Sequence, residues 1–493
     1  MKKAFDEKKY LKLQSLNILE RVKKFDNKLY IEFGGKLFDD YHASRVLPGF
    51  MPDTKLKMLL TIKEQVEIVI VINSHDIQNN KVRSDIGINY ESDVLRLIDA
   101  FRESGLFVGS VVITQYEAQT SVVQFKTKLN NLGVKTYLHY HIDSYPYNIP
   151  YILSEEGFGK NEYIETTKPI VVITAPGPGS GKMATCLSQL YHEHKRGIRA
   201  GYAKYETFPI WNLPLKHPVN LAYEAATVDL NDVNLIDPYH LEAYNTLAIN
   251  YNRDVDVFPV LKAIFDSIYG ESPYKSPTDM GVNMAGFAIA NDEAACDAAK
   301  REIVRRYFNT ICDVKYGKVS SEASDKIAVL MRQLNISVEN RKCVKAALEK
   351  AELTNTPSMA IELNNGKIIT AKTTTLLGAP AALIINAIKY LAKIDDCLML
   401  ISPNVIEPIQ RLKIDKLGNH NPRLHADEVL VALAISAQTN PIAEMAFEKL
   451  GSLKGCEAHS TVILPNIDEN IFKKLGVNLT TEPQFYAKKL YRK

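Results

Sequence analysis

Apolar runs alternate with segments of helical period along the first part of the chain. Residues 66–72, 108–114 and 134–140 form β-type runs, the first two rich in Val and Ile. The segments between them, 91–104 and 119–132, place apolar residues on one helical face. Apolar runs of this length are typical of strands that are buried on both faces. The order therefore predicts a β-α-β-α-β unit with a parallel sheet.

The same alternation continues towards the middle of the chain. Residues 170–175 are a further apolar run, 181–195 have helical period, and 199–205 form another β-type segment. We therefore predict that residues 1–228 form one doubly wound α/β domain. Ligands of such sheets bind beyond the carboxyl ends of the strands. The polar residues that we expect near this edge, or in solvated loops, are Asn73, Asp76, His139, His141 and Asp143.

The pattern changes between residues 229 and 353, where β-branched runs are few. We predict a helical domain for 229–353, with helices at 238–250, 255–270, 291–311, 321–335 and 339–352. The segment 269–281 inside it is rich in turn residues. Loops of this length line a site or an interface in many proteins, and a plain connector is the alternative.

Alternation returns after residue 353, and we predict a smaller α/β domain over 354–493. Its expected strands are 358–363, 367–370, 397–401 and 457–464. Its expected helices are 379–393, 426–437 and 442–450. The Asn365-Gly366 pair between the first two strands is a strong hairpin signal.

The segment 169–185 carries the clearest chemical signal. An apolar run breaks there into a turn with Gly177, Gly179 and Gly181, followed by Lys182. Glycines let several backbone N–H groups converge on an anion, and the following helix points its positive end at the same place. We predict phosphate or nucleotide binding by Gly177, Gly179, Ser180, Gly181, Lys182 and Thr185. A turn that needs glycine only for packing is the alternative.

Two departures from the P-loop pattern G-x-x-x-x-G-K-[ST] bear on metal binding. Pro176 stands where the first glycine belongs, and Met183 replaces the Ser or Thr whose hydroxyl holds Mg²⁺. Thr185 lies about 200° around the helix from that position, so it does not obviously take its place. ATP or another nucleotide is the expected cofactor class, and we do not expect Mg²⁺ to be held through residue 183.

Composition and charge indicate which broad class of protein the chain belongs to. The 493 residues include 46% hydrophobic and 24% charged residues, and the net charge is +3. This balance is typical of ordinary globular proteins and gives no indication of nucleic-acid binding. No apolar segment follows the basic N-terminus and no run of 18 apolar residues occurs, so we expect neither a signal peptide nor a membrane span. The six cysteines form no C-x-x-C pair, which suits a cytoplasmic location.

A second lysine follows the glycine-rich turn. The turn, Gly181-Lys182, a helix and then an Ala-Gly-Tyr strand with Lys204 resemble the opening of dethiobiotin-synthetase-type P-loop enzymes, in which a lysine on the second strand faces the phosphates. Lys204 is shifted by one place, which reverses its face in a regular strand. Lys182, Lys204 and Glu206 are our catalytic candidates.

Four segments resemble an uncharacterised family along the whole chain. They are GKLFDDYHASRVLPG at 35–49, TAPGPGSGKMA at 174–184, YETFPIWNLPLKHPVNLAYEAA at 205–226 and HADEVL at 425–430. They are similar to uncharacterised protein family 0371, a bacterial family with a domain of unknown function. The resemblance implies a cytoplasmic bacterial protein with an N-terminal α/β part, a helical part and a C-terminal α/β part. It also implies that Met183 belongs to the family's own motif.

Two further segments carry polar residues whose role the sequence leaves open. Residues 211–220 contain the one tryptophan, Lys216 and His217, and either face a substrate or pack around Trp211. Glu224, Asp229 and Asp232 follow, and any of them could supply a carboxylate to a metal ion.

His420, His425, Asp427 and Glu428 lie within the C-terminal segment 418–428. A His two residues before an acid at a helix start is similar to zinc cytidine deaminases, but their P-C-x-x-C motif is absent and Asp427 stands in place of Glu. Helix capping is the alternative.

The leading hypothesis is an NTP-dependent transferase or ligase that binds a phosphate-bearing small molecule through the modified P-loop. A non-catalytic nucleotide or metabolite sensor, and a metal-assisted hydrolase at His420–Glu428, are the alternatives. The expected partner is a small molecule, with neither nucleic acid nor membrane, and a homo-oligomer is possible. The sequence assigns no metal ligand and no reaction.

Overall fold

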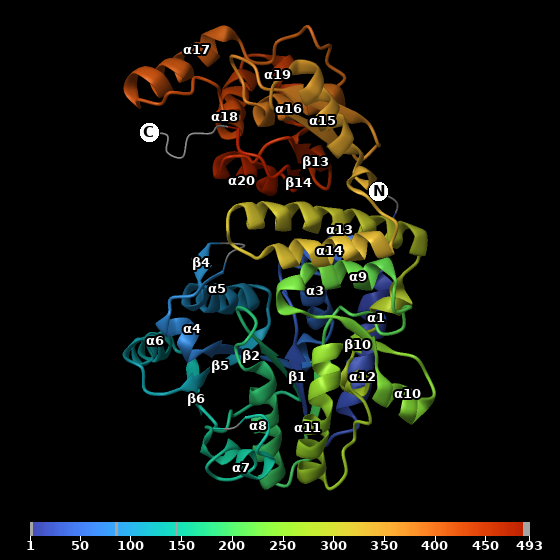
Figure 1. Ribbon diagram of the computed structural model, residues 1–493. Coiled ribbons are helices and arrows are strands. Elements are labelled where there is room, and N and C mark those ends of the chain that lie inside the picture. The colour runs from blue at the N-terminus through green and yellow to red at the C-terminus, as the bar shows by residue number, and fades with distance from the viewer. Residues whose placement is uncertain (1–2, 84–86, 144, 487–493) are drawn as a thin grey trace. The chain divides into compact units, whose positions relative to one another are not determined.

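The computed structural model describes residues 3–83, 87–143 and 145–486. The chain divides into two compact units. The N-terminal unit comprises residues up to 224 together with 231–296, and the C-terminal unit comprises 225–230 together with the chain from 297 onward. The predicted helical segment 229–353 is therefore shared between these two units. Figure 1 shows the elements and their labels.

A six-stranded parallel sheet forms the centre of the N-terminal unit, in the order β6-β5-β2-β7-β1-β8. Its strands are β1 (Leu29–Phe33), β2 (Val66–Asn73), β5 (Phe107–Tyr116), β6 (Lys135–Tyr140), β7 (Ile170–Thr174) and β8 (Gly201–Tyr205). The predicted α/β class and parallel sheet are confirmed. After β2 the chain adds β5 and β6 on one side of the sheet, and after β7 it continues to β8 on the other side. The order of connection therefore reverses between the adjacent strands β2 and β7. Crevices at such points are where ligands bind in open α/β sheets.

Strand β1 is absent from the sequence prediction, although it lies between β7 and β8. Its five residues, Leu-Tyr-Ile-Glu-Phe, are too few to show a period, and they follow a strongly charged helix. The strand exists because both neighbours pair with it: Leu29 lies opposite Ile170 on one side and Gly201 on the other.

Helices cover this sheet, and only some of them begin with a side-chain cap. The Asn89 side chain accepts a hydrogen bond from the Ser92 N–H at the start of α5, whereas α8 begins at Gly181 with no side-chain cap. Helix α8 packs against β1, β7 and β8, and α5 against β2 and β5. The helices up to residue 200 are α1 (Glu7–Val22), α2 (Tyr41–Val46), α3 (Thr54–Thr61), α4 (Ser74–Gln78), α5 (Tyr90–Glu103), α6 (Thr120–Asn131), α7 (Ile149–Ile152) and α8 (Lys182–Lys195).

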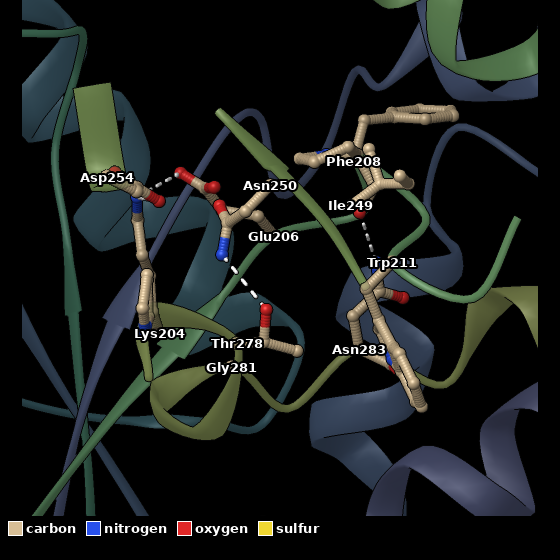
Figure 2. A pocket seen from close by; sticks show the side chains of 12 residues that line it. Lys204, Glu206, Phe208, Trp211, Ile249, Asn250, Asp254, Thr278, Gly281 and Asn283 are labelled. Atoms are coloured by element: carbon tan, nitrogen blue, oxygen red, sulfur yellow. Dashed lines mark hydrogen bonds and ion pairs between the residues drawn. The ribbon is translucent and has the colours of Figure 1, made fainter. Parts of the chain in front are cut away.

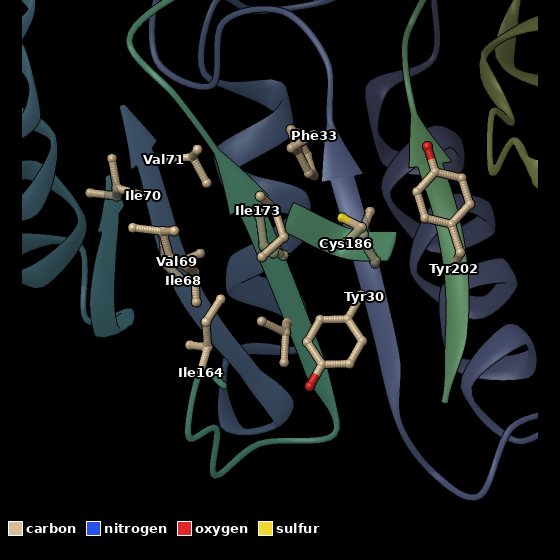
Figure 3. Close-up of a cluster of buried hydrophobic side chains, with 14 of the residues drawn as sticks. Tyr30, Phe33, Ile68, Val69, Ile70, Val71, Ile164, Ile173, Cys186 and Tyr202 are labelled. Atoms are coloured by element: carbon tan, nitrogen blue, oxygen red, sulfur yellow. The ribbon is translucent and has the colours of Figure 1, made fainter. Parts of the chain in front are cut away.

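The core of the N-terminal unit is built from the strands and the helices that cover them. Ile68, Val69, Ile70 and Val71 of β2 are all fully buried, as expected for a central parallel strand. Figure 3 shows these side chains beside those of β7, β1 and β8, with Cys186 of α8 among them. This rigid centre fixes the positions at which the strands end.

The remainder of the N-terminal unit follows β8. Helix α11 (Asn252–Tyr269) packs against α8, and the two helices lie side by side in Figure 1. The predicted helix 238–250 ends early: α10 (Pro238–Tyr244) stops at Asn245, which has positive φ, and Ile249–Tyr251 form strand β10. The other elements here are α9 (Pro218–Ala226), β9 (Asn234–Ile236), α12 (Pro277–Met280) and the short pair β3 (Val82–Arg83) and β4 (Ile88–Asn89).

A separate mixed sheet forms the C-terminal unit, in the order β12-β11-β13-β14. Its strands are β11 (Ser358–Glu362), β12 (Ile368–Lys372), β13 (Glu457–Ser460) and β14 (Asn478–Thr481). The predicted hairpin at Asn365-Gly366 is confirmed by the antiparallel pairing of β11 with β12. The helices after residue 291 are α13 (Asp292–Lys315), α14 (Ser321–Gln333), α15 (Lys342–Thr354), α16 (Ala379–Leu391), α17 (Pro403–Arg411), α18 (Ala426–Ala437), α19 (Pro441–Phe447) and α20 (Asn466–Lys474).

The predicted strand 397–401 is wrong, because this segment forms a turn before α17. The Lys389 ammonium donates to the carbonyl oxygens of Asp396 and Leu398, which takes acceptors that a sheet would need. Met399 is 70% exposed, so the apolar run does not mark a buried strand. Predicted helix 379–393, in contrast, is the buried core helix α16.

Among the described residues, no helix is both long enough and apolar enough to span a membrane.

Candidate functional site

The loop between β7 and α8 presents unused hydrogen-bond donors at the carboxyl edge of the sheet. Within the described part of the chain, the backbone N–H groups of residues 179–183 have no hydrogen-bond acceptor. Gly179 and Gly181 have φ of 74° and 86°, the left-handed region in which glycine carries no steric penalty. Successive amides in such a loop form a concave anion-binding surface. The loop therefore carries adjacent amide donors without a partner among the described residues, and the prediction of phosphate binding depends on these donors.

Neighbouring strands hold this loop in place through its carbonyl groups. The Asn73 amide at the end of β2 donates to the Gly179 carbonyl at 3.2 Å, and the Thr114 hydroxyl on β5 donates to the Ser180 carbonyl at 2.8 Å. These contacts occupy carbonyl oxygens and leave the amide hydrogens directed elsewhere. They also place the loop beside β2, at the point where the chain direction reverses.

Close packing explains the glycine at position 177. A Cβ atom there would lie 2.1 Å from the hydroxyl oxygen of Tyr90, the first residue of α5. The loop therefore lies directly against Tyr90, whose ring would have to move if residue 177 carried a side chain.

Lys182 supplies a positive charge at the first turn of α8. Its ammonium group has no carboxylate within 4.0 Å among the described residues, and its side chain is half-buried. The amino end of a helix and an unpaired lysine both favour an anion. Lys182 therefore brings to the start of α8 a positive charge that no carboxylate of the described residues neutralises.

The two hydroxyl candidates of the loop differ in their surroundings. The Ser180 hydroxyl donates to the Gly177 carbonyl at 2.8 Å and so closes the turn. The Thr185 hydroxyl is buried, and among the described residues it has no hydrogen-bond partner. Met183 packs against the hydrophobic core and offers no oxygen to a cation. Of the two predicted ligand residues, Thr185 retains an unused polar atom.

Glu32 lies on the strand next to the loop strand. It is paired with Ile173 of β7 on one side and with Lys204 of β8 on the other. Its carboxylate accepts a hydrogen bond from the Tyr202 hydroxyl at 2.7 Å. The pKa of the Cys186 thiol in α8 is raised by burial and by the Glu32 charge, and is lowered by Lys182. The charges of Glu32 and Lys182 thus shift the pKa of the same thiol in opposite directions.

Lys204 and Glu206 meet Asp254 at the rim of a cavity of about 40 Å³. The Lys204 ammonium lies 2.5 Å from the Asp254 carboxylate and 3.3 Å from that of Glu206 (Figure 2). Lys204 and Asp254 are 9% and 8% exposed, whereas Glu206 is 27% exposed and reaches the cavity. Two catalytic candidates of the sequence are therefore brought together.

Burial changes the protonation of this group. The pKa of Glu206 is raised to about 7, chiefly by burial. The positive charge of Lys204 lowers this pKa, and the negative charge of Asp254 raises it further. The pKa of Lys204 is raised because burial is outweighed by the carboxylates of Asp254, Glu206 and Glu32. A carboxyl group that titrates near neutral pH can both accept and donate a proton, which is the property of a general acid or base.

The same cavity explains two segments that the sequence left open. Trp211 lines it, and the indole N–H donates to the Asn283 carbonyl at 2.9 Å. Thr278 and Gly281, from the turn-rich segment 269–281, also line it, beside Asn250 of β10. Both segments therefore contribute to a cavity.

The loop and the cavity lie on the same side of the sheet. Neighbouring strands are about 4.8 Å apart, so the backbones of Ile173 and Lys204 are separated by roughly 10 Å, with Glu32 between them. Paired residues of parallel strands face the same side, and Lys204 faces Asp254 on α11, the helix that packs against α8.

Several predicted site residues lie elsewhere or serve the fold. Burial lowers the pKa of His139 to about 3, and its ring contacts the Glu162 carbonyl, so this residue belongs to the core. His141 pairs with Asp143 in an exposed loop, and Asp76 pairs with Lys81.

The carboxylates proposed for a metal ion have structural partners. Glu224 accepts hydrogen bonds from Asn234, and Asp232 pairs with Arg253. Asp229 is exposed in a short turn.

The histidine-rich segment of the C-terminal unit serves as a helix cap. Glu428 accepts the His425 N–H at the start of α18 and pairs with Lys413. His425 lies 3.0 Å from Asp468, and this hydrogen bond is the main cause of its raised pKa. Among the described residues, His420, Asp427 and Glu428 join no group of three metal ligands.

Sequence reasoning missed Glu32 and Asp254. A single Glu in the apolar strand Leu-Tyr-Ile-Glu-Phe is a signal, because a buried strand tolerates a charge only with a partner or a function. Asp254 gave no signal, since it stands in the first turn of a helix, where acids are common.

The parallel sheet, the glycine-rich loop after β7 and the separate mixed sheet define a multidomain α/β protein. The chain matches the models for the domain of unknown function DUF1846, N-terminal over residues 3–335 and C-terminal over residues 339–491. It is 56% identical over 490 residues to a UPF0371 protein of Streptococcus pyogenes serotype M28, with 99% of each chain covered. It is also 56% identical over 492 residues to a UPF0371 protein of Streptococcus pneumoniae, with all of each chain covered. The chain belongs to this uncharacterised bacterial family, as the sequence motifs indicated.

Proposed function

We propose that this protein is an enzyme that binds a phosphate-bearing small molecule, such as a nucleotide, at residues 177–183 and transfers a group at the Glu206 cavity. The observation that supports this most is the set of unused amides beside the unpaired Lys182 at the switch point of the sheet. Such a loop lowers the energy of negative charge on phosphoryl oxygens. The cavity with Glu206 on the same side supplies a group that can move a proton.

The surroundings of each residue indicate its role in the proposed reaction. Lys182 and the amides of residues 179–183 hold the phosphate and stabilise charge that develops during transfer. Glu206 takes or gives the proton of the second reacting group. Lys204 is paired with Asp254, so it orients Glu206 and neutralises the local charge instead of binding phosphate.

A divalent cation would have to be held by carboxylates in this site. Met183 offers no hydroxyl, whereas Glu32 places a carboxylate on the strand adjoining β7. The Thr185 hydroxyl is a second unused oxygen near the start of α8. These are the groups on which Mg²⁺ binding would depend.

A nucleotide or metabolite sensor is the second candidate. Met183 favours it, because a site that holds Mg²⁺ weakly stabilises the transferring phosphoryl group less. Multiple-turnover release of phosphate distinguishes the two, since a sensor retains its ligand unchanged. In either case we expect a cytoplasmic location.

The test begins with a thermal-shift screen of nucleotides, coenzymes and sugar phosphates, with and without Mg²⁺. Calorimetry then compares Lys182→Ala with the matched control Lys195→Ala, which lies at the other end of α8 and is exposed. We expect Lys182→Ala to abolish binding of the best ligand, and Lys195→Ala to leave it unchanged. Equal affinity of both variants would refute the proposal.

A further inference from the structure

Three side chains of different ligand types meet outside the Glu206 cavity. The His217 Nε2 atom lies 3.0 Å from an Asp292 carboxylate oxygen and 3.5 Å from the Cys296 Sγ atom. The Cys296 Sγ atom lies 3.8 Å from the second Asp292 oxygen. We call these three residues the His217 cluster. Within the described residues it is the one group of three or more such side chains that are close enough to share an ion.

The fold brings the cluster together from two segments. His217 immediately precedes α9, and its ring is 8% exposed. Asp292 and Cys296 are one turn apart in the first turns of α13, so they project from the same face. The buried imidazole fixes one side of the cluster, while the Asp292 side chain, 64% exposed, leaves the other side open to solvent.

The distances are close to those between ligands of a tetrahedral zinc ion. Zinc lies about 2.0–2.2 Å from nitrogen and oxygen ligands and about 2.3 Å from sulfur, so ligand atoms are about 3.4 to 3.6 Å apart. The separation of 3.5 Å between His217 and Cys296 lies in this range. The separations of 3.0 and 3.8 Å, which involve the two different oxygens of Asp292, lie just below and just above it.

We propose that the His217 cluster binds one zinc ion, with His217, Asp292 and Cys296 as ligands and water in the fourth position. Nitrogen, sulfur and carboxylate oxygen together suit zinc, whereas Mg²⁺ and Ca²⁺ take oxygen ligands. Sites with three protein ligands and a water are the open kind of zinc site.

Zinc binding would move one proton within the His217 ring and release another from Cys296. Nδ1 of His217 accepts the Val219 N–H at 3.2 Å, so without metal the ring proton lies on Nε2 and is donated to Asp292. When Nε2 binds zinc, that proton moves to Nδ1 and the long contact with Val219 is lost. The Cys296 thiol releases its proton to solvent as the thiolate binds. Affinity therefore increases with pH.

The ion would fix the end of the segment that forms the cavity. Residues 206–217 begin at Glu206, include Trp211 and end at His217. A metal that joins His217 to α13 would restrict this segment at its far end. The inference does not depend on the proposed function, because the cluster contains none of the residues assigned to phosphate binding or proton transfer.

Cobalt provides the test, because a thiolate bound to Co²⁺ absorbs in the near ultraviolet. Metal-free protein is titrated with Co²⁺ alone, and then with Zn²⁺ in competition. We expect one equivalent of Co²⁺, an intense thiolate-to-cobalt band, and displacement by Zn²⁺. Cys296→Ser should lose the band and bind Zn²⁺ more than about 100-fold more weakly. Cys397→Ser, at an exposed cysteine of the C-terminal unit, is the matched control and should behave as the wild type.

His217→Gln provides a second variant, and circular dichroism of the metal-free proteins verifies that each variant is folded. The proposal is overturned if Co²⁺ binds without a thiolate band. It is equally overturned if Cys296→Ser and Cys397→Ser bind Zn²⁺ with the same affinity.

Discussion

Glu32 and Lys204 lie opposite each other on the neighbouring strands β1 and β8, and the Lys204 ammonium contacts Asp254 of α11 from the other side. A buried lysine thus stands among the carboxylates of Glu32, Glu206 and Asp254. Glu32 is also the partner of Ile173 on β7, the strand that precedes the glycine-rich loop.

Replacement of Lys204 by Met should destabilise the N-terminal unit by about 3 kcal/mol, because it leaves Asp254 buried without its cation. Urea unfolding, followed by the fluorescence of Trp211, measures the loss. The double variant Lys204→Met/Asp254→Leu should regain much of this stability, since no buried charge is left unpaired between these two positions. A double variant as unstable as the single one would contradict the pairing.

Replacement of Glu206 by Gln should change how stability depends on pH. The pKa of Glu206 is about 7 in the folded protein and near 4.5 when unperturbed, so the folded state binds more protons between these values. The contribution of the Glu206 carboxyl to the free energy of unfolding is therefore complete below pH 4.5 and is lost as the pH rises to about 7. The melting temperature of the wild type should therefore fall relative to that of Glu206→Gln between pH 5 and about 8.

The control for that measurement is Glu103→Gln, at an exposed position near the end of α5. Its melting temperature should follow that of the wild type throughout the pH range. A constant difference between wild type and Glu206→Gln would show that Glu206 titrates normally.

Gly179→Ala and Gly181→Ala should lower the free energy of unfolding by different amounts, although both glycines have positive φ. An alanine at either position costs about 1–2 kcal/mol in the left-handed region. A Cβ atom at residue 181 would also lie 3.1 Å from the Thr114 side chain, whereas no atom lies within 4 Å at residue 179. Urea unfolding should therefore rank Gly181→Ala as the less stable, and Thr114→Ala should reduce the difference.

Arg341→Leu should destabilise the C-terminal unit by at least about 3 kcal/mol. The Arg341 guanidinium is 1% exposed, pairs with Glu457, and donates to the carbonyl oxygens of Ala458 and Asn478. Its loss leaves a carboxylate and two carbonyl groups without their donor. Differential scanning calorimetry measures the change, with Arg332→Ala, at an exposed position of α14, as a control near zero.

Segments with a clear apolar or amphipathic pattern were predictable from the sequence. Strands β2, β5 and β7 and helices α5, α8 and α18 lie within a few residues of their predicted positions. Strand β1 and helix α17 were missed: β1 carries a charged residue, Glu32, within five residues, and α17 contains Pro408, a residue that disfavours a helix interior.

The site was recognised as separate groups and not as one arrangement. The loop glycines and Lys182 are adjacent in sequence, so their spacing alone indicated an anion site. Lys204 and Glu206 were named from a resemblance, but Asp254 is 50 residues away from Lys204 in the chain. The third member of that cluster could only be found once α11 was packed against α8.

The sequence by itself determined the α/β class, the glycine-rich turn after β7 and the family, because each depends on local patterns of residues. Tertiary structure alone decided which charges are neighbours. Glu32, Lys204, Glu206 and Asp254 come from three separate segments, and so do not share any local pattern. Only the parallel pairing of β1 with β8 and the packing of α11 bring them together, and the loss of solvent around Glu206 raises the pKa of this carboxyl towards neutral pH.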